Sequence, residues 1–215
     1  MPTVFLDRDG VINENRDDHV KSWSEFRFLP GALDALRMLT RQRFRIFVVT
    51  NQACVNRGLA SPSTINDIHR RMSYTARSHG ARIEDVRFCP HRPDEACHCR
   101  KPHPGMLLDL ALTHGVSLSG AYLVGDAASD IAAGRAVGCK TVMVRTGRGA
   151  RQLAAGAAAV YQPEAVADDL LAASRWICAQ ETARPLVAEE APELAHQSYW
   201  PPPATTLVEE RLEPC

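Results

Sequence analysis

Four short apolar runs stand out along the first two thirds of the chain. They are Val4–Leu6, Ile46–Val49, Ala121–Val124 and Thr141–Val144. Uninterrupted apolar runs of this length are typical of strands that are buried on both faces of a sheet. The pattern therefore predicts four central strands.

Segments with helical spacing of apolar residues separate these runs. The predicted helices are one around Leu33–Leu39 and four over residues 61–80, 104–115, 126–138 and 164–179. Ser61 and Pro62 favour a helix start there, because Ser caps helices and Pro fits their first position. Strands that alternate with helices predict an α/β fold with a doubly wound parallel sheet.

The charge balance excludes some classes of function. The 25 basic and 25 acidic residues among 215 give a formal net charge of zero, which argues against a nucleic-acid binder. No apolar run approaches the roughly 18–20 residues that a membrane span needs. The N-terminus carries no secretory leader pattern. We therefore expect a cytoplasmic protein that binds neither nucleic acid nor membrane.

The acidic residues and the prolines gather near the C-terminus. Residues 183–215 hold six acidic residues against two basic ones, and six of the 14 prolines. Such a composition buries too little apolar surface to offset the entropy of ordering. We expect a folded domain over residues 1–182 and a mostly disordered tail over 183–215. The alternative is that Tyr199, Trp200 and the prolines that follow dock another protein.

A pair of aspartates follows the first predicted strand. Strand alternation places Asp7 and Asp9 on the same side and turns Arg8 away from them. Two carboxylates this close repel each other, and a divalent cation relieves the repulsion. One could then act as a nucleophile while the other transfers protons. An ordinary turn is the alternative, because Asp and Gly are common turn residues.

Further polar residues follow the second and third predicted strands, where open α/β sheets bind ligands. Asp126 could complete an oxygen site for Mg²⁺, and Thr50 and Asn51 could hold a bound group. All three are also common capping residues. Lys101 is one of only three lysines beside 22 arginines, which favours a role as a compact point charge, although so small a count also arises by chance.

Three of the seven cysteines lie within 11 residues, in the pattern C-x-H-x5-C-x-C. The cluster consists of Cys89, His91, Cys97 and Cys99, with His98 competing with His91. Three cysteines and one histidine form closed, structural Zn²⁺ sites. A disulfide and unpaired thiols are the alternatives. A zinc loop over residues 89–99 would fix the direction of the following Arg100 and Lys101.

Taken in order, these motifs resemble those of the haloacid dehalogenase-like (HAD) phosphatases over residues 3–148. The matching motifs are Asp7-x-Asp9, Thr50, Lys101 and Gly125-Asp126-x-x-x-Asp130. The resemblance implies a Rossmann-like sheet that is capless or carries a minimal cap.

The resemblance also implies a covalent mechanism. Asp7 would attack phosphorus to form an aspartyl-phosphate, and Asp9 would protonate the leaving alcohol and later activate water. Mg²⁺ would lie between Asp7, the Asp9 backbone carbonyl and Asp126. Thr50 and Lys101 would hold the phosphoryl oxygens.

The cysteine–histidine cluster narrows the resemblance to the zinc-loop subgroup, which acts on heptose bisphosphates and on histidinol phosphate. It implies that His91, not His98, binds zinc. Arg100 matches an arginine that reads a second phosphate. The other implied substrate contacts are Asn15, Asp18, Asn51 and Gln52. Cys54 departs from the usual glycine, either as a small apolar filler or as a reactive thiol.

The resemblance thus implies a monomeric, Mg²⁺- and Zn²⁺-containing phosphatase for a small sugar phosphate. The favoured substrate is the 7-phosphate of D-glycero-D-manno-heptose 1,7-bisphosphate, because Arg57-Gly58 and the segment Lys101–Met106 are closer to the heptose branch. Histidinol phosphate is the alternative substrate. A non-catalytic, zinc-stabilised binding module is the alternative from another class.

Overall fold

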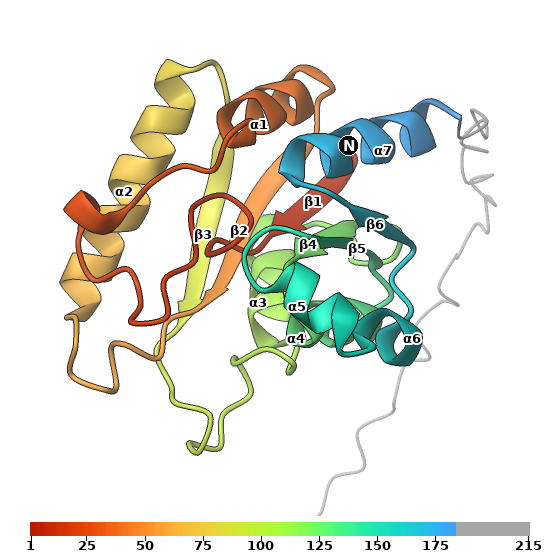
Figure 1. The fold of residues 1–215 in the computed structure, drawn as a ribbon. Coiled ribbons are helices and arrows are strands. Elements are labelled where there is room, and N and C mark those ends of the chain that lie inside the picture. Colours follow the sequence, from red (N-terminus) through yellow and green to blue (C-terminus); the bar gives the residue numbers. More distant parts are fainter. Residues whose placement is uncertain (184–215) are drawn as a thin grey trace, which may run out of the picture. The chain divides into compact units, whose positions relative to one another are not determined.

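Six parallel strands form one sheet in a computed structural model that describes residues 1–183 (Figure 1). The strand order is β3-β2-β1-β4-β5-β6. The strands are β1 (Thr3–Leu6), β2 (Arg45–Asn51), β3 (Ile83–Cys89), β4 (Tyr122–Gly125), β5 (Lys140–Val144) and β6 (Ala165–Ala167). This doubly wound order confirms the predicted fold class. The predicted tail over 183–215 lies, apart from Ala183, outside the described residues, so its boundary stays a prediction.

Helices cover both faces of the sheet. They are α1 (Ala32–Arg41), α2 (Pro62–Ser78), α3 (Gly105–His114), α4 (Ala128–Arg135), α5 (Gly149–Ala154), α6 (Ala157–Tyr161) and α7 (Leu170–Thr182), with a 3-10 turn η1 (Trp23–Glu25) before α1. Helices α1, α2 and α7 share one core with one face of the sheet, and α3 packs in a second core on the other face. Among the described helices, none combines the length and the apolar character that crossing a membrane requires.

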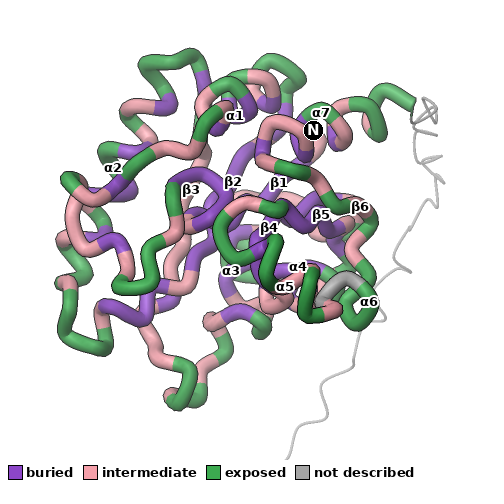
Figure 2. Tube along the Cα trace, viewed as in Figure 1, coloured by how far each residue is buried: buried purple, intermediate pink, exposed green. Residues whose placement is uncertain are grey.

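The central strands have no exposed face, as their sequences predict. In β1, Val4 and Leu6 point into the core under α1 and α7, while Phe5 points into the core under α3. All four residues of β1 and of β4 are buried (Figure 2). This burial on both faces holds the carboxyl ends of β1 and β4 in fixed positions, and the candidate site begins there.

Two strands were not predicted, and both lie at the edges of the sheet. β3 is only half-buried and carries charged residues, so it lacks an apolar run. β6 is three residues long. The helix predicted over 164–179 is wrong at its start, because Ala165–Ala167 pair with β5 and α7 begins only after the cap Asp169. Alanine favours a helix by its intrinsic propensity, and the pairing with β5 overrides that preference here.

From β1 the chain adds β2 and β3 on one side of the sheet and then β4, β5 and β6 on the other side. This switch between neighbouring strands β1 and β4 leaves a crevice at their carboxyl ends. The Asp7 N–H donates to the Val124 carbonyl at 2.9 Å, so the residue after β1 lies beside the last residues of β4. The chain between β1 and α1 forms a loop beside this crevice and contains η1. In the described part of the chain, this loop and the cysteine–histidine loop are the small cap elements.

Candidate functional site

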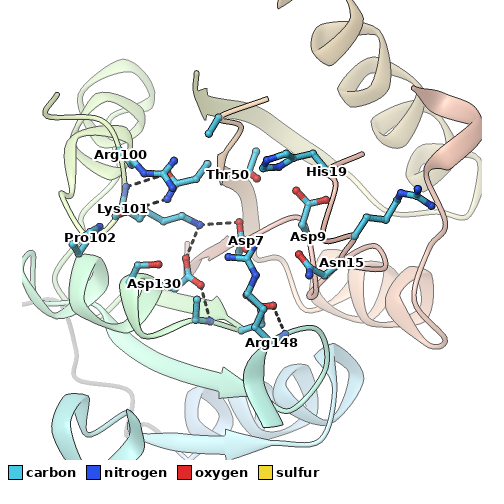
Figure 3. A pocket seen from close by; sticks show the side chains of 16 residues that line it. Asp7, Asp9, Asn15, His19, Thr50, Arg100, Lys101, Pro102, Asp130 and Arg148 are labelled. Atoms are coloured by element: carbon cyan, nitrogen blue, oxygen red, sulfur yellow. Dashed lines mark hydrogen bonds and ion pairs between the residues drawn. The ribbon is translucent and has the colours of Figure 1, made fainter. Parts of the chain in front are cut away.

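A cavity of about 300 Å³ opens at the carboxyl ends of β1, β2 and β4 (Figure 3). Most of the sequence-predicted site residues line it: Asp7, Asp9, Asn15, Thr50, Asn51, Arg100, Lys101 and Asp126. Residues that the sequence left without a role also line it: Arg16, His19, Asp130 and Arg148. The structure therefore brings three separate strand ends and two loops together around one polar hollow.

Three aspartates form the floor of this cavity. One carboxylate oxygen from each of Asp7, Asp126 and Asp130 lies within 4.8 Å of the others, and all three residues are buried. Burial raises the pKa of Asp7 to about 6, although the charge of Lys101 opposes the rise. Burial, together with the charges of Asp7 and Asp130, raises the pKa of Asp126 to about 8. Buried carboxylates that resist ionisation in this way are suited to hold a divalent cation.

Two glycines allow the close approach of Asp126 to the first loop. A Cβ added to Gly10 or Gly147 would lie 2.1 or 2.2 Å from the Asp126 Oδ2 atom, and both glycines have positive φ. The same Oδ2 accepts the backbone N–H of Arg148 at 2.8 Å. The other oxygen of Asp126 remains available to a ligand. Asp7 and Asp126 therefore fit the predicted Mg²⁺ site chemically and sterically.

Lys101 lies between two of these aspartates. Its Nζ atom is 2.8 Å from Asp7 Oδ1 and 2.6 Å from Asp130 Oδ1, and it donates to the Val49 carbonyl at 2.7 Å. Burial disfavours the ammonium charge, but the two carboxylates outweigh it and raise the pKa of Lys101. The backbone of Lys101 is held in turn by the Asn51 side chain, which donates at 3.0 Å and accepts at 3.1 Å.

Asp9 lies on the opposite side of the cavity from Lys101 (Figure 3) and is held by hydrogen bonds from its own loop and from Gln52, the residue just after β2. Its carboxylate accepts from Asn13 Nδ2 at 2.8 Å and from Gln52 Nε2 at 2.7 Å. Burial acts to raise the pKa of Asp9, but the charge of Arg8 and these hydrogen bonds hold it below its ordinary value. Asp7 and Asp9 line the cavity and Arg8 does not, as predicted. The prediction that Arg8 turns away from both is wrong for Asp9, because β1 ends at Leu6 and strand alternation stops before these residues.

Two of the predicted substrate contacts, Gln52 and Asp18, do not line the cavity. Gln52 is fully buried and bridges the Asp9 carboxylate to the Thr50 hydroxyl, to which it donates at 2.8 Å. Asp18 does not line the cavity and pairs with Arg16 and Lys21 on the surface. Cys54 is buried, and burial raises the pKa of its thiol, which favours the apolar-filler interpretation over a reactive thiol.

The sequence motif that starts at Gly125 includes Asp130 but gives it no role, whereas Arg16, His19 and Arg148 are not predicted at all. Arg16, His19 and Arg148 stand among 22 arginines and eight histidines, where no spacing singles them out. The arginines Arg16, Arg100 and Arg148 give the rim of the cavity a positive charge above its acidic floor, whereas burial lowers the pKa of His19 and favours its neutral form. Such a rim is suited to an anionic ligand.

The four predicted zinc ligands converge beside the cavity. The Sγ atoms of Cys89 and Cys99 are 3.1 Å apart, and the His91 Nδ1 atom lies 3.4 and 3.3 Å from them. Cys97 Sγ lies 3.8 Å from Cys89 and 3.7 Å from Cys99. Ligands around a tetrahedral Zn²⁺ lie roughly 3.5–3.8 Å apart, so these side chains fit the ion. His98 is exposed and is not part of the cluster.

This loop also positions residues of the cavity. Arg100 Nη1 donates to the His91 carbonyl at 3.1 Å. The Gly105 N–H donates to the His98 carbonyl at 3.1 Å, and a Cβ on Gly105 would lie 2.2 Å from that oxygen. The loop and the start of α3 are therefore packed too closely to move independently, and Arg100 and Lys101 lie between them.

The chain matches known proteins over most of its length. It is 38% identical over 175 residues to the D-glycero-beta-D-manno-heptose-1,7-bisphosphate 7-phosphatase of Pseudomonas putida, covering 81% of this chain and 98% of that protein. A sequence-family model described as HAD-hydrolase-like matches residues 98–173. The chain belongs to the HAD-like phosphatase family. It is accordingly an enzyme of the phosphoric monoester hydrolase type, and the alternative of a non-catalytic binding module is not supported.

A second relative and a solved structure, both from Bordetella bronchiseptica, are also similar to this HAD-like phosphatase. The phosphatase of the same name from Bordetella bronchiseptica is 41% identical over 156 residues, which is 73% of this chain and 87% of that protein. The crystal structure of the D,D-heptose 1,7-bisphosphate phosphatase from B. bronchiseptica, complexed with magnesium and phosphate, superposes with a TM-score of 0.78 at 38% identity. It covers 84% of this chain and 99% of that one.

Proposed function

We propose that this phosphatase removes the 7-phosphate of D-glycero-beta-D-manno-heptose 1,7-bisphosphate, with Mg²⁺ in the aspartate cluster and Zn²⁺ in the cysteine–histidine loop. The observation that carries the proposal is the cavity itself, in which a buried nucleophile-type carboxylate, Asp7, faces a rim of arginines. A bisphosphate presents one phosphate to the floor and the other to the rim. The relatives of the same name and the magnesium and phosphate bound in the B. bronchiseptica enzyme support this assignment.

Asp7 is proposed as the nucleophile. Its Oδ1 atom is engaged by Lys101, which leaves the second oxygen to attack phosphorus. A bond forms between that oxygen and phosphorus while the bond from phosphorus to the sugar oxygen breaks. Asp7 and Asp126 would hold Mg²⁺, which when bound neutralises phosphoryl charge. We propose that Lys101 and the Thr50 hydroxyl hold the equatorial oxygens of the transferred group.

Asp9 is proposed to move the protons. In the first step the proton on Asp9 passes to the departing sugar oxygen, so that a neutral alcohol leaves. In the second step a water molecule attacks phosphorus, its proton returns to Asp9, and the Asp7 carboxylate is released with inorganic phosphate. Asp9 is ionised in the free protein, and it takes up the proton for the first step from solvent when a phosphate dianion bound beside it raises its proton affinity. Its side chain is 20% exposed, toward the cavity.

The zinc loop is proposed to be structural. Four protein side chains would fill the positions around a tetrahedral Zn²⁺, which would leave none open to a substrate. The Arg100 guanidinium donates a hydrogen bond to the His91 carbonyl of this loop, and Arg100 lines the cavity. The loop thereby orients the guanidinium. We propose that Arg100, with Asn15 and Asn51, contacts the part of the substrate distant from the transferred phosphoryl group.

Phosphate release with Mg²⁺ tests the proposed substrate. The purified protein is given the β and α anomers of the heptose 1,7-bisphosphate and, separately, histidinol phosphate, and ³¹P NMR identifies which phosphate is lost. We expect the highest kcat/KM with the β anomer and loss of the 7-phosphate. A higher kcat/KM with histidinol phosphate, or loss of the 1-phosphate, would overturn the assignment of the substrate.

A further inference from the structure

Arg8 is the largest fully buried side chain among the described residues, at 0% exposure. A buried guanidinium needs partners for its N–H groups, because an unpaired buried charge is strongly destabilising. Two of its nitrogens serve Asp9: Nη2 lies 2.9 Å from both Oδ1 and Oδ2, and Nε lies 3.3 Å from Oδ1. Its third nitrogen, Nη1, lies 3.0 Å from the His69 Nε2 atom.

His69 belongs to no motif of the site. It lies in α2, 61 positions after Arg8, and is 5% exposed, with its ring packed edge-on against Phe88 of β3 at 5.6 Å. A guanidinium can only donate, so the His69 Nε2 atom accepts the hydrogen bond and the ring is neutral. Burial and the charge of Arg8 lower the pKa of His69 to about 3, in keeping with this geometry.

Hydrogen bonds to both of its oxygens fix the orientation of the Asp9 carboxylate. Oδ1 accepts from Arg8 and from Asn13, and Oδ2 accepts from Arg8 and from Gln52. Asn13 and Gln52 each reach one oxygen, whereas the Arg8 fork reaches both and so sets the plane of the carboxylate. The fork is itself held from behind by His69. Neither Arg8 nor His69 is among the residues that line the cavity, so both act from behind Asp9 and not from the cavity itself.

We propose that His69, acting through Arg8, is a positioning residue that holds the Asp9 carboxylate in the orientation for proton transfer to the leaving oxygen. This inference rests on the proposed function, in which Asp9 protonates the departing alcohol. Without an acceptor at position 69, Nη1 of Arg8 is left unpaired in the core. Because an unpaired buried donor is unfavourable, the guanidinium is expected to rotate toward another acceptor. The plane of the Asp9 carboxylate turns with it.

The leaving group provides the test. A sugar alkoxide must receive a proton as it departs, whereas p-nitrophenolate is a stable anion and departs without one. The ratio kcat/KM covers the steps up to the first transfer to Asp7, so it omits the later attack by water. Comparing kcat/KM for heptose bisphosphate with kcat/KM for p-nitrophenyl phosphate therefore isolates protonation of the leaving group.

We expect His69→Leu to lower kcat/KM for the sugar phosphate by about tenfold to about hundredfold, and for p-nitrophenyl phosphate by less than about threefold. His69→Gln, whose side-chain oxygen reaches the position of Nε2, is expected to restore most of the loss. If His69→Leu does not fold, His69→Asn replaces it, because the shorter amide does not reach Arg8.

Two controls separate positioning from general loosening of the structure. Ile68→Val removes a methylene beside His69 in the same buried face of α2, and His79→Leu makes the same substitution at an exposed histidine just after α2. Both are expected to leave the ratio between the two substrates unchanged. Equal losses on both substrates in His69→Leu, or no loss on either, would overturn the positioning role while leaving the phosphatase assignment intact.

Failure of the proposed function has a different signature. If the wild-type protein hydrolyses p-nitrophenyl phosphate and another alkyl phosphate but not the heptose bisphosphate, only the substrate is wrong, and the alkyl phosphate serves in the same comparison. If it hydrolyses no phosphate ester, the proposed function and the inference both fail.

Discussion

Replacing Asp126 by Asn should stabilise the Mg²⁺-free protein while it removes activity. Asp126 is 2% exposed and lies with two other buried carboxylates on the floor of the cavity. Asn has nearly the same shape, and its oxygen can keep the hydrogen bond from the Arg148 N–H. What the substitution removes is a group that must take up a proton, or bury its charge, when the protein folds.

The size of the effect follows from the pKa. A pKa of about 8, in place of the ordinary 3.8, means that the folded state holds a proton that the unfolded state releases. Each tenfold change in proton affinity is worth about 1.4 kcal/mol, so the cost to folding at pH 7 is about 4 kcal/mol, and at pH 5 it is about 2 kcal/mol. The stability linked to this group is fully present below pH 3.8 and is lost as pH rises toward 8.

Urea unfolding at pH 5 and pH 7, after dialysis into Mg²⁺-free buffer that leaves the zinc site undisturbed, measures this effect. Asp126→Asn should unfold at a higher midpoint than the wild type, with the larger gain at pH 7. Adding Mg²⁺ should stabilise the wild type and have little effect on the variant, which lacks a charged ligand. Asp168→Asn is the matched control, because its side chain is 86% exposed, and it should change little.

A variant that is less stable than the wild type at pH 7 would refute the reasoning, and so would a gain that does not depend on pH. Either result would mean that the hydrogen bonds of Asp126 outweigh the cost of burying its charge. A wild-type protein that Mg²⁺ does not stabilise would contradict the placement of the cation between Asp7 and Asp126.

Three further predictions follow from the site. Lys101→Met should lower kcat by about 10² to 10³, measured by phosphate release, because it removes a preorganised positive charge beside the phosphoryl oxygens. Cys97→Ser should reduce the zinc content in elemental analysis, lower Tm and raise KM, because Arg100 is held by the loop; unchanged KM in zinc-free protein would contradict that link. Cys54 should resist alkylation in the folded protein and react in urea, as mapped by mass spectrometry, because burial raises the pKa of its thiol.

The central strands could be predicted because β1, β2, β4 and β5 are buried on both faces and so appear as apolar runs in the sequence. The edge strands could not. β3 carries Asp85 and Arg87, which pair with each other at 2.7 Å and with residues outside the strand, and these charges hide it from a hydrophobicity pattern. Pairing with β2 is what makes it a strand.

The candidate site likewise contains residues that the sequence reveals and residues that it does not. Asp7, Asp126 and the cysteine cluster are visible in the sequence because their residue types and positions after strands indicate their chemistry. The choice between His91 and His98 needed either a resemblance or the structure, since their spacings both allow a ligand. Arg8 and His69 were beyond prediction, because their meeting depends on how α2 packs against the loop after β1. Long-range packing of this kind leaves no local pattern.

Covalent chemistry at Asp7 is the central step of the proposed mechanism, and rapid acid quenching during turnover of the heptose bisphosphate tests it directly. Peptide mapping by mass spectrometry should find one phosphoryl group on the peptide that contains Asp7 in the wild type, and none in Asp7→Asn, which should also release no phosphate. Phosphate release at the wild-type rate by Asp7→Asn, or a phosphoryl group on another residue, would contradict the account.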